Sequence, residues 1–184
     1  MQRTKKLILS SLFAAITALL AQFSFPLPFS PVPLTGQTFA VFLTGALLGK
    51  CWGAVSLLIY ILLGAAGLPV FHNAQGGLHI ILGPTGGFLW GFVLGTCLLG
   101  KFVEKRDSYP AMLLGMFFCL LTYFSLGTLQ LSYIAGLDLR QALMMGVLPF
   151  LPLDLVKLFA AAHLSFAVKR RLVRAGLLPA TEQK

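Results

Sequence analysis

The sequence predicts an all-α integral membrane protein with six transmembrane helices in a single domain, residues 1–184. Hydrophobic residues make up 58% of the chain and charged residues only 10%, whereas about a quarter of the residues in a soluble domain are charged. The mean hydropathy is +0.89. Long apolar stretches leave too few polar side chains to cover a surface that faces water, and a bilayer removes that requirement.

Prolines, glycines and charges divide the chain into six hydrophobic stretches. We expect helices at residues 6–25, 36–49, 52–66, 84–103, 110–134 and 142–168. The first ends at FPLPFSPVP, where proline prevents a regular helix. The last contains Pro149 and Pro152. The second and third are shorter than the roughly 20 residues that cross a hydrocarbon core, so we expect irregular backbone lining a cavity beside them.

The first stretch also has the order of residues found in a signal peptide. Arg3, Lys5 and Lys6 precede an apolar run, as in a secretory leader. The run is long enough to span a bilayer, and no convincing small-x-small cleavage site precedes the prolines. We therefore expect a retained first helix.

The positions of lysine and arginine predict the orientation. Of 14 such residues, 12 lie at the N-terminus, at Lys50, within residues 101–106 and in the tail 169–184. If six helices cross the membrane in alternating directions, all four segments lie on the same side. The positive-inside rule assigns that side to the cytoplasm. We expect a multi-pass protein of the cell membrane with both termini and the basic tail in the cytoplasm, and a disordered end after Leu178. The same distribution argues against binding to nucleic acid.

Asp154 and Lys157 are the strongest candidates for a site. They lie three residues apart within LPLDLVKLFAA, so a helix places them on one face. An ionisable residue inside the bilayer costs about 2.5 to 3.5 kcal/mol on insertion scales and by default marks a functional site. Counting back from Lys169 puts Asp154 in the outer half of the membrane, beneath the outer loops. A self-neutralising ion pair is the alternative, but such a pair gains little over apolar packing.

Other side chains can line the same outer cavity. Gln37 and Thr38 begin the second helix, and Asn73 lies in the outer loop after the third helix. Their amides and hydroxyl suit ligand binding, although capping a helix or stabilising a loop is equally compatible. The aromatic side chains of Tyr60, Phe71 and Phe88 can form an apolar wall of the cavity or belong to the packed interior.

Several chemistries are disfavoured by spacing. No two of His72, His79 and His163 share helical spacing with a carboxylate, which argues against a metal site. Ser10, Ser11 and Ser56 lack a credible histidine partner for proteolysis. GPTGGF lacks the lysine of a phosphate-binding loop, and the three cysteines form neither a disulfide nor a zinc framework.

Ala14 and Ala18 form a small-xxx-small pair on the first helix. Such spacing lets a second helix approach closely. Contact with a partner subunit and ordinary internal packing are both open.

Four segments resemble the BioY family, the biotin-specific S components of energy-coupling factor (ECF) transporters. They are PVPLTGQTFAVFLTGALLG, YILLGAAGLPVF, GPTGGFLWGF and PLDLVK, within a likeness from about Lys5 to Arg171. The resemblance implies an ECF S-component fold of six helices, an outward-facing biotin pocket, no ATPase activity, and assembly with a T component that carries two ATPase subunits. It also implies partner contacts at Ala14 and Ala18 and ligand contacts at Asp154, Lys157, Gln37 and Thr38. Asn73 lies in HNAQGG, which is less regular than the family's common version.

Biotin suits these side chains. Asp154 can accept from the ureido N–H groups, and Lys157 can donate to the ureido oxygen or hold the carboxylate. We therefore expect a high-affinity biotin-binding subunit of an ATP-driven importer, with biotin as its cargo, no cofactor and no enzymatic activity. The rivals are an intramembrane enzyme using Asp154, Lys157 and a histidine, and the same fold serving another vitamin or a structural role.

Overall fold

The computed structural model describes residues 3–106 and 108–174. Five of its helices are long and apolar enough to cross a membrane. They are α1 (Arg3–Gln22), α2 (Gln37–Ala65), α4 (Gly86–Lys105), α5 (Tyr109–Ala135) and α7 (Leu151–Arg174). The prediction of a mainly helical protein with several membrane spans is confirmed. Large apolar side chains cover the outer faces of these helices, including Leu19, Leu62 and Phe159, as a lipid environment favours.

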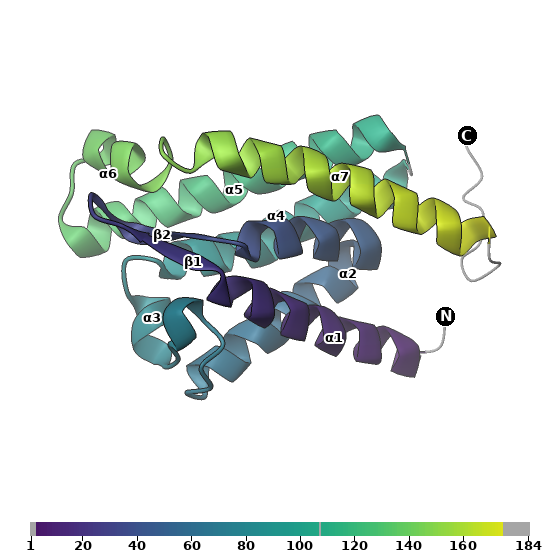
Figure 1. The fold of residues 1–184 in the computed structure, drawn as a ribbon, viewed down its shortest axis with the longest axis horizontal. Helices are drawn as coiled ribbons and strands as arrows, with labels where there is room; N and C mark the ends of the chain where they lie inside the picture. The colour runs from purple at the N-terminus through teal and green to yellow at the C-terminus, as the bar shows by residue number, and fades with distance from the viewer. Residues whose placement is uncertain (1–2, 107, 175–184) are drawn as a thin grey trace.

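The shorter elements gather at one end of the molecule, away from the start of α1 and the end of α7 (Figure 1). They are β1 (Ser24–Leu27), β2 (Ser30–Thr35), the 3₁₀ turn η1 (His72–Ala74), α3 (Leu78–Leu82) and α6 (Leu139–Gly146). Of these, the sequence predicted neither the strands nor α3.

Helix α2 contains the second and third predicted helices and is broken at Gly49. Gly49 has φ 77° and ψ −174°, a conformation that residues with a side chain avoid. Beyond it the chain folds back, because a Cβ added to Gly53 would lie 3.5 Å from the Cα of Gly45. Eight residues of straight helix would separate these positions by about 12 Å. The two halves therefore pack against each other (Figure 1), while a count of six spans stays a prediction.

The proline-rich segment forms an antiparallel hairpin in place of an irregular loop. Ser24 pairs with Thr35, and Leu27 pairs with Ser30. The register is irregular around Pro26, which has no N–H to donate to a strand partner. The Ser30 hydroxyl donates to the carbonyl oxygen of Met145 at 2.8 Å. This bond fastens the hairpin to α6, so the hairpin is an ordered part of the fold.

The chain forms two helices, α6 and α7, where one helix was predicted at residues 142–168. Asp138 caps α6 in a capping box with Gln141, which starts that helix earlier than predicted. The interruption follows at residues 147–150. Pro149 lies inside it, and Pro152 lies in the first turn of α7, where a missing N–H is tolerated.

The described parts of the four basic segments lie toward the end where α1 begins and α7 ends (Figure 1). Lys6 Nζ lies 5.8 Å from the centre of the Trp52 ring, and Lys50 forms an ion pair of 3.5 Å with Glu104. Lys169 borders a hollow beside the same glutamate. This grouping agrees with the predicted sorting of charge. Residues 175–184 of the predicted basic tail, and its expected disorder after Leu178, lie outside the described residues.

Candidate ligand-binding site

A pocket lies at the end of the molecule opposite the basic segments. Its lining comes from β2, η1, α3, α4, α5 and α7 together with the first turn of α2 and the α6–α7 connection. The empty space in and around it amounts to about 590 Å³, counting the open space at its mouth. Most of the wall is apolar, and its aromatic members are Phe71, Phe88, Phe92, Tyr123, Phe124 and Phe150.

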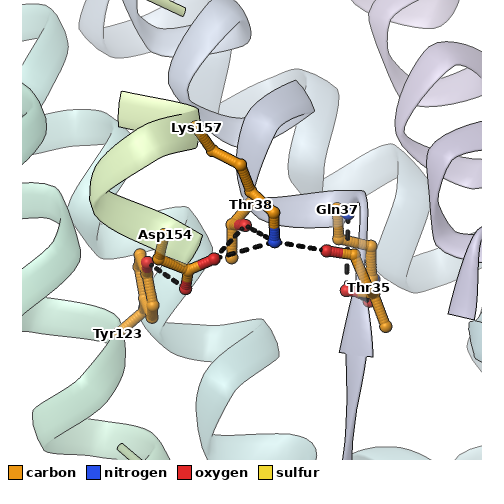
Figure 2. A network of polar contacts seen from close by, with 6 residues as sticks. All are labelled: Thr35, Gln37, Thr38, Tyr123, Asp154 and Lys157. Atoms are coloured by element: carbon orange, nitrogen blue, oxygen red, sulfur yellow. Dashed lines mark hydrogen bonds and ion pairs between the residues drawn. The ribbon is translucent and has the colours of Figure 1, made fainter. Parts of the chain in front are cut away.

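Asp154 and Lys157 form the polar corner of this pocket (Figure 2). They lie near the start of α7, and the Lys157 Nζ is 2.8 Å from Oδ1 of Asp154. The same ammonium group donates to the carbonyl oxygen of Thr35 at 2.6 Å and to Oγ1 of Thr38 at 3.1 Å. An ammonium group has three hydrogens. Each hydrogen of Lys157 thus has an acceptor within the chain.

The carboxylate of Asp154 is held from two further helices. Thr38 on α2 donates to Oδ1 at 2.9 Å, and Tyr123 on α5 donates to Oδ2 at 2.8 Å. Asp154 is only 3% exposed. The pair is therefore neutralised and hydrogen-bonded without a guest, yet it faces a pocket. A ligand that binds here must exchange with these bonds or add to them.

Gln37 joins this corner to the aromatic wall. Its Nε2 donates to the hydroxyl of Tyr60 at 2.6 Å, and it lines the pocket while Tyr60 does not. Tyr60 packs edge-on against Phe71, with ring centres 5.4 Å apart. Phe71 lies directly over Gly64, where a Cβ would meet its ring. Tyr60 therefore fixes the positions of Gln37 and Phe71 from outside the pocket.

Asn73 is exposed and lies outside the residues that line the pocket. Its neighbour His72 lines the pocket instead. The loop that carries both is held by Gln22 of α1, which donates to the carbonyl oxygen of Phe71 at 3.0 Å and accepts from the N–H of Ala74 at 2.9 Å. A ligand contact by Asn73 stays a prediction.

Ala14 and Ala18 differ in their surroundings. Ala14 is 1% exposed and belongs to the core, whereas Ala18 is half-buried at the edge of that core. Internal packing, one of the two alternatives, accounts for Ala14. Contact of either alanine with a partner subunit stays a prediction.

Tyr123 and Thr35 have no feature in the sequence that marks them as site residues. Tyr123 lies in an apolar run with several aromatic residues, where nothing local distinguishes it from a packing residue. Thr35 contributes its backbone carbonyl to Lys157, a role that any residue type can fill. Both were identified only by the packing of distant segments. His72 was considered as a metal ligand or a catalytic residue, not as a ligand-binding one. In the described part of the chain no group of three or more histidine, cysteine or acidic side chains is placed to hold a metal ion.

The fold and the pocket define a membrane-embedded protein whose helices surround a small-molecule site with one buried ion pair. The chain belongs to the BioY family, which it matches over residues 1–174. It is 40% identical over 166 residues to the biotin transporter BioY of Thermotoga maritima, covering 90% of this chain and 96% of the relative. The biotin transporter BioY of Rhizobium etli is 36% identical over 187 residues, covering 96% of this chain and 98% of the relative.

A solved structure also matches. The crystal structure of the S component for biotin from an ECF-type ABC transporter superposes with a TM-score of 0.86 at 25% identity, covering 92% of this chain and 95% of that one. The predicted family is thus confirmed. The family and these relatives are transport proteins, so the chain is a transporter component and not an enzyme. The relatives are named for a transported compound, and none indicates a cofactor.

Proposed function

We propose that this chain is the high-affinity biotin-binding S component of an ECF transporter, and that it captures biotin at the outer face of the cell membrane for ATP-driven import. One observation carries the proposal: the buried Asp154–Lys157 pair opens onto an aromatic pocket. The names of the relatives, which are biotin transporters and a biotin S component, support the choice of ligand.

The polar corner suits the ureido ring of biotin. This ring carries two N–H donors and one carbonyl acceptor, and Asp154 and Lys157 supply the complementary acceptor and donor. Since Thr38 and Tyr123 already donate to the carboxylate, its oxygens are held in place before the ligand arrives. An analogue without the ureido groups would leave buried polar atoms without ligand partners, so it should bind much more weakly.

The remaining predicted site residues take supporting roles in this proposal. Gln37 and Thr38 border the polar corner, and Phe71 offers its ring to the apolar part of the ligand. Tyr60 fixes both Gln37 and Phe71. We assign Asn73, the exposed neighbour of His72, a polar contact with the part of the ligand that reaches the mouth of the pocket.

Calorimetry on the purified protein tests the ligand. Biotin, riboflavin and thiamine are titrated into the unaltered protein, and biotin alone should bind saturably. Asp154→Asn should weaken biotin binding, because the amide carries no charge and has a single acceptor oxygen. The proposal is overturned if biotin fails to bind, or if the three vitamins bind equally well.

We further propose six membrane crossings, with the two halves of α2 crossing separately and both termini in the cytoplasm. An even number of crossings is supported by α1 beginning and α7 ending at the same end of the molecule (Figure 1). The basic segments at that end support its cytoplasmic side. Single cysteines in a cysteine-free variant test this. An impermeant maleimide should label His79→Cys in intact cells, and Lys50→Cys only after permeabilisation. Labelling of Lys50→Cys in intact cells, or in neither condition, contradicts six crossings.

Assembly with a T component and two ATPase subunits belongs to the same proposal. It rests on membership of the family and on the small-residue face of α1 with Ala18 at its edge. The T component would contact α1 and couple ATP hydrolysis to release of biotin into the cytoplasm. Copurification of this subunit with a T component tests the assembly.

A further inference from the structure

His72 lines the pocket with an unused imidazole. Both of its ring nitrogens are shielded from solvent and have no hydrogen-bond partner within residues 3–106 and 108–174. Five hydroxyl groups share this property, and none of them belongs to a residue that lines the pocket: Ser24, Ser56, Thr96, Thr128 and Ser165. A buried polar group without a partner destabilises the folded chain. An unpaired imidazole at a binding pocket is therefore expected to form a hydrogen bond with the bound ligand.

The loop around His72 is built to keep this ring in place. Asn73 and Ala74 both have positive φ, 55° and 54°, a region that residues other than glycine rarely adopt. Gln22 binds the backbone just before η1 and at its last residue, and Phe71 and Gln75 pair across it. Strain that is retained by several surrounding bonds indicates a fixed position for the side chain.

His72 and the ion pair approach the pocket from different parts of the fold. Asp154 and Lys157 lie on α7, which runs along the upper edge of Figure 1, whereas the α2–α3 connection that carries η1 lies along the lower edge. The pocket thus has polar groups from two separated parts of the fold, and aromatic side chains make up much of its wall. An elongated ligand with one polar ring and one polar tail matches this arrangement.

We propose that His72 donates a hydrogen bond to the tail carboxylate of the ligand, while the ureido ring meets Asp154 and Lys157. This inference rests on the proposed function, in which the ligand is biotin. Lys157, whose three hydrogens already have acceptors in the chain, would exchange one of them for the ureido oxygen, and among the described residues no other lysine, arginine or histidine lines the pocket. His72 is therefore the basic side chain with a free donor. Hydrogen bonds to an ionised acceptor are among the strongest that a neutral donor can form.

The chemistry needs no change in the charge of the imidazole. Burial lowers the pKa of His72 below its usual value, which favours the neutral ring. A neutral imidazole keeps one N–H to donate and one nitrogen to accept. The tail carboxylate of the ligand accepts a hydrogen bond from this N–H group.

Four binding titrations, which combine two proteins with two ligands, test the assignment. The unaltered protein and His72→Phe are titrated with biotin and with biotinamide, whose tail is uncharged. The unaltered protein should prefer biotin by about tenfold or more, the effect expected of one hydrogen bond to a charged group. His72→Phe should bind biotin about tenfold more weakly and biotinamide within about twofold of the unaltered protein. His72→Gln, which keeps a donor, should retain part of the preference and covers the case in which the phenylalanine variant fails to fold.

His79→Phe is the matched control, because His79 is exposed and outside the pocket. It should leave both affinities unchanged. The assignment is overturned if His72→Phe keeps the full preference for biotin, or if it weakens both ligands equally. Absence of biotin binding by the unaltered protein is a different result, because it overturns the proposed function itself and this inference with it.

Discussion

Tyr123 of α5 donates a hydrogen bond of 2.8 Å to Oδ2 of Asp154 of α7, on the side of the carboxylate that faces away from Lys157 (Figure 2). The tyrosine is 1% exposed, and its ring packs edge-on against Phe92 at 5.3 Å. Its hydroxyl therefore has little freedom to move. The carboxylate is fixed by a neutral donor on one oxygen and by Lys157 and Thr38 on the other.

Replacing Tyr123 by phenylalanine should weaken both folding and binding. Oδ2 of Asp154 would lose the donor that the structure gives it, and an unsatisfied buried group costs about 1 to 3 kcal/mol. We expect a loss of that size in the free energy of unfolding in detergent, and weaker biotin binding by calorimetry. Tyr133→Phe is the control, because Tyr133 is 86% exposed. Equal stability and affinity of Tyr123→Phe and the unaltered protein would show that the bond has no role.

The ion pair should be dispensable for folding only when both charges are removed. Lys157→Met leaves the buried Asp154 carboxylate with neutral donors alone, and breaking a buried pair costs about 3 to 5 kcal/mol. Adding Asp154→Asn should recover most of that stability, since the amide oxygen can still accept from Thr38 or Tyr123. The double variant should fold and yet fail to bind biotin in calorimetry. A double variant as unstable as Lys157→Met, or one that binds biotin normally, would contradict this prediction.

Gly64→Ala should distort the pocket through Phe71. A Cβ at position 64 meets the ring of Phe71, which is 1% exposed and packs edge-on against Tyr60. Overpacking of this kind typically costs about 1 to 3 kcal/mol. We expect lower thermal stability and weaker biotin binding. Adding Phe71→Leu, which shortens the clashing side chain, should restore stability more than affinity, because the ring also lines the pocket. No gain in stability from the second change would exclude the clash as the cause.

The two small residues of α1 should behave differently when enlarged. Ala14→Leu adds atoms in the core and should lower the stability of the isolated subunit by about 1 to 3 kcal/mol. Ala18→Leu, at the half-buried edge, should leave unfolding and biotin binding nearly unchanged but reduce copurification with the T component. Normal copurification of Ala18→Leu would remove Ala18 from the proposed partner surface. Unchanged stability of Ala14→Leu would contradict its place in the core.

The sequence by itself determined the features that depend on local pattern. Apolar runs and the sorting of lysine and arginine identified a helical membrane protein, because the bilayer acts on each segment separately. The pairing of Asp154 with Lys157 was also predictable, since three residues are about one helical turn. Glycine and proline marked Gly49 and the segment before Gln37 as departures from helix, though not the fold-back or the hairpin that they form.

Only the tertiary structure decided which other residues meet this pair. Thr38 and Asp154 are 116 residues apart, and Tyr123 lies 31 residues from the same carboxylate, so no periodicity connects them. The same holds for Ala14, whose burial depends on how α1 packs on α2, and for His72, which points into the pocket where Asn73 does not. Contacts of this kind arise from the mutual packing of whole helices and loops, which no single segment of sequence encodes.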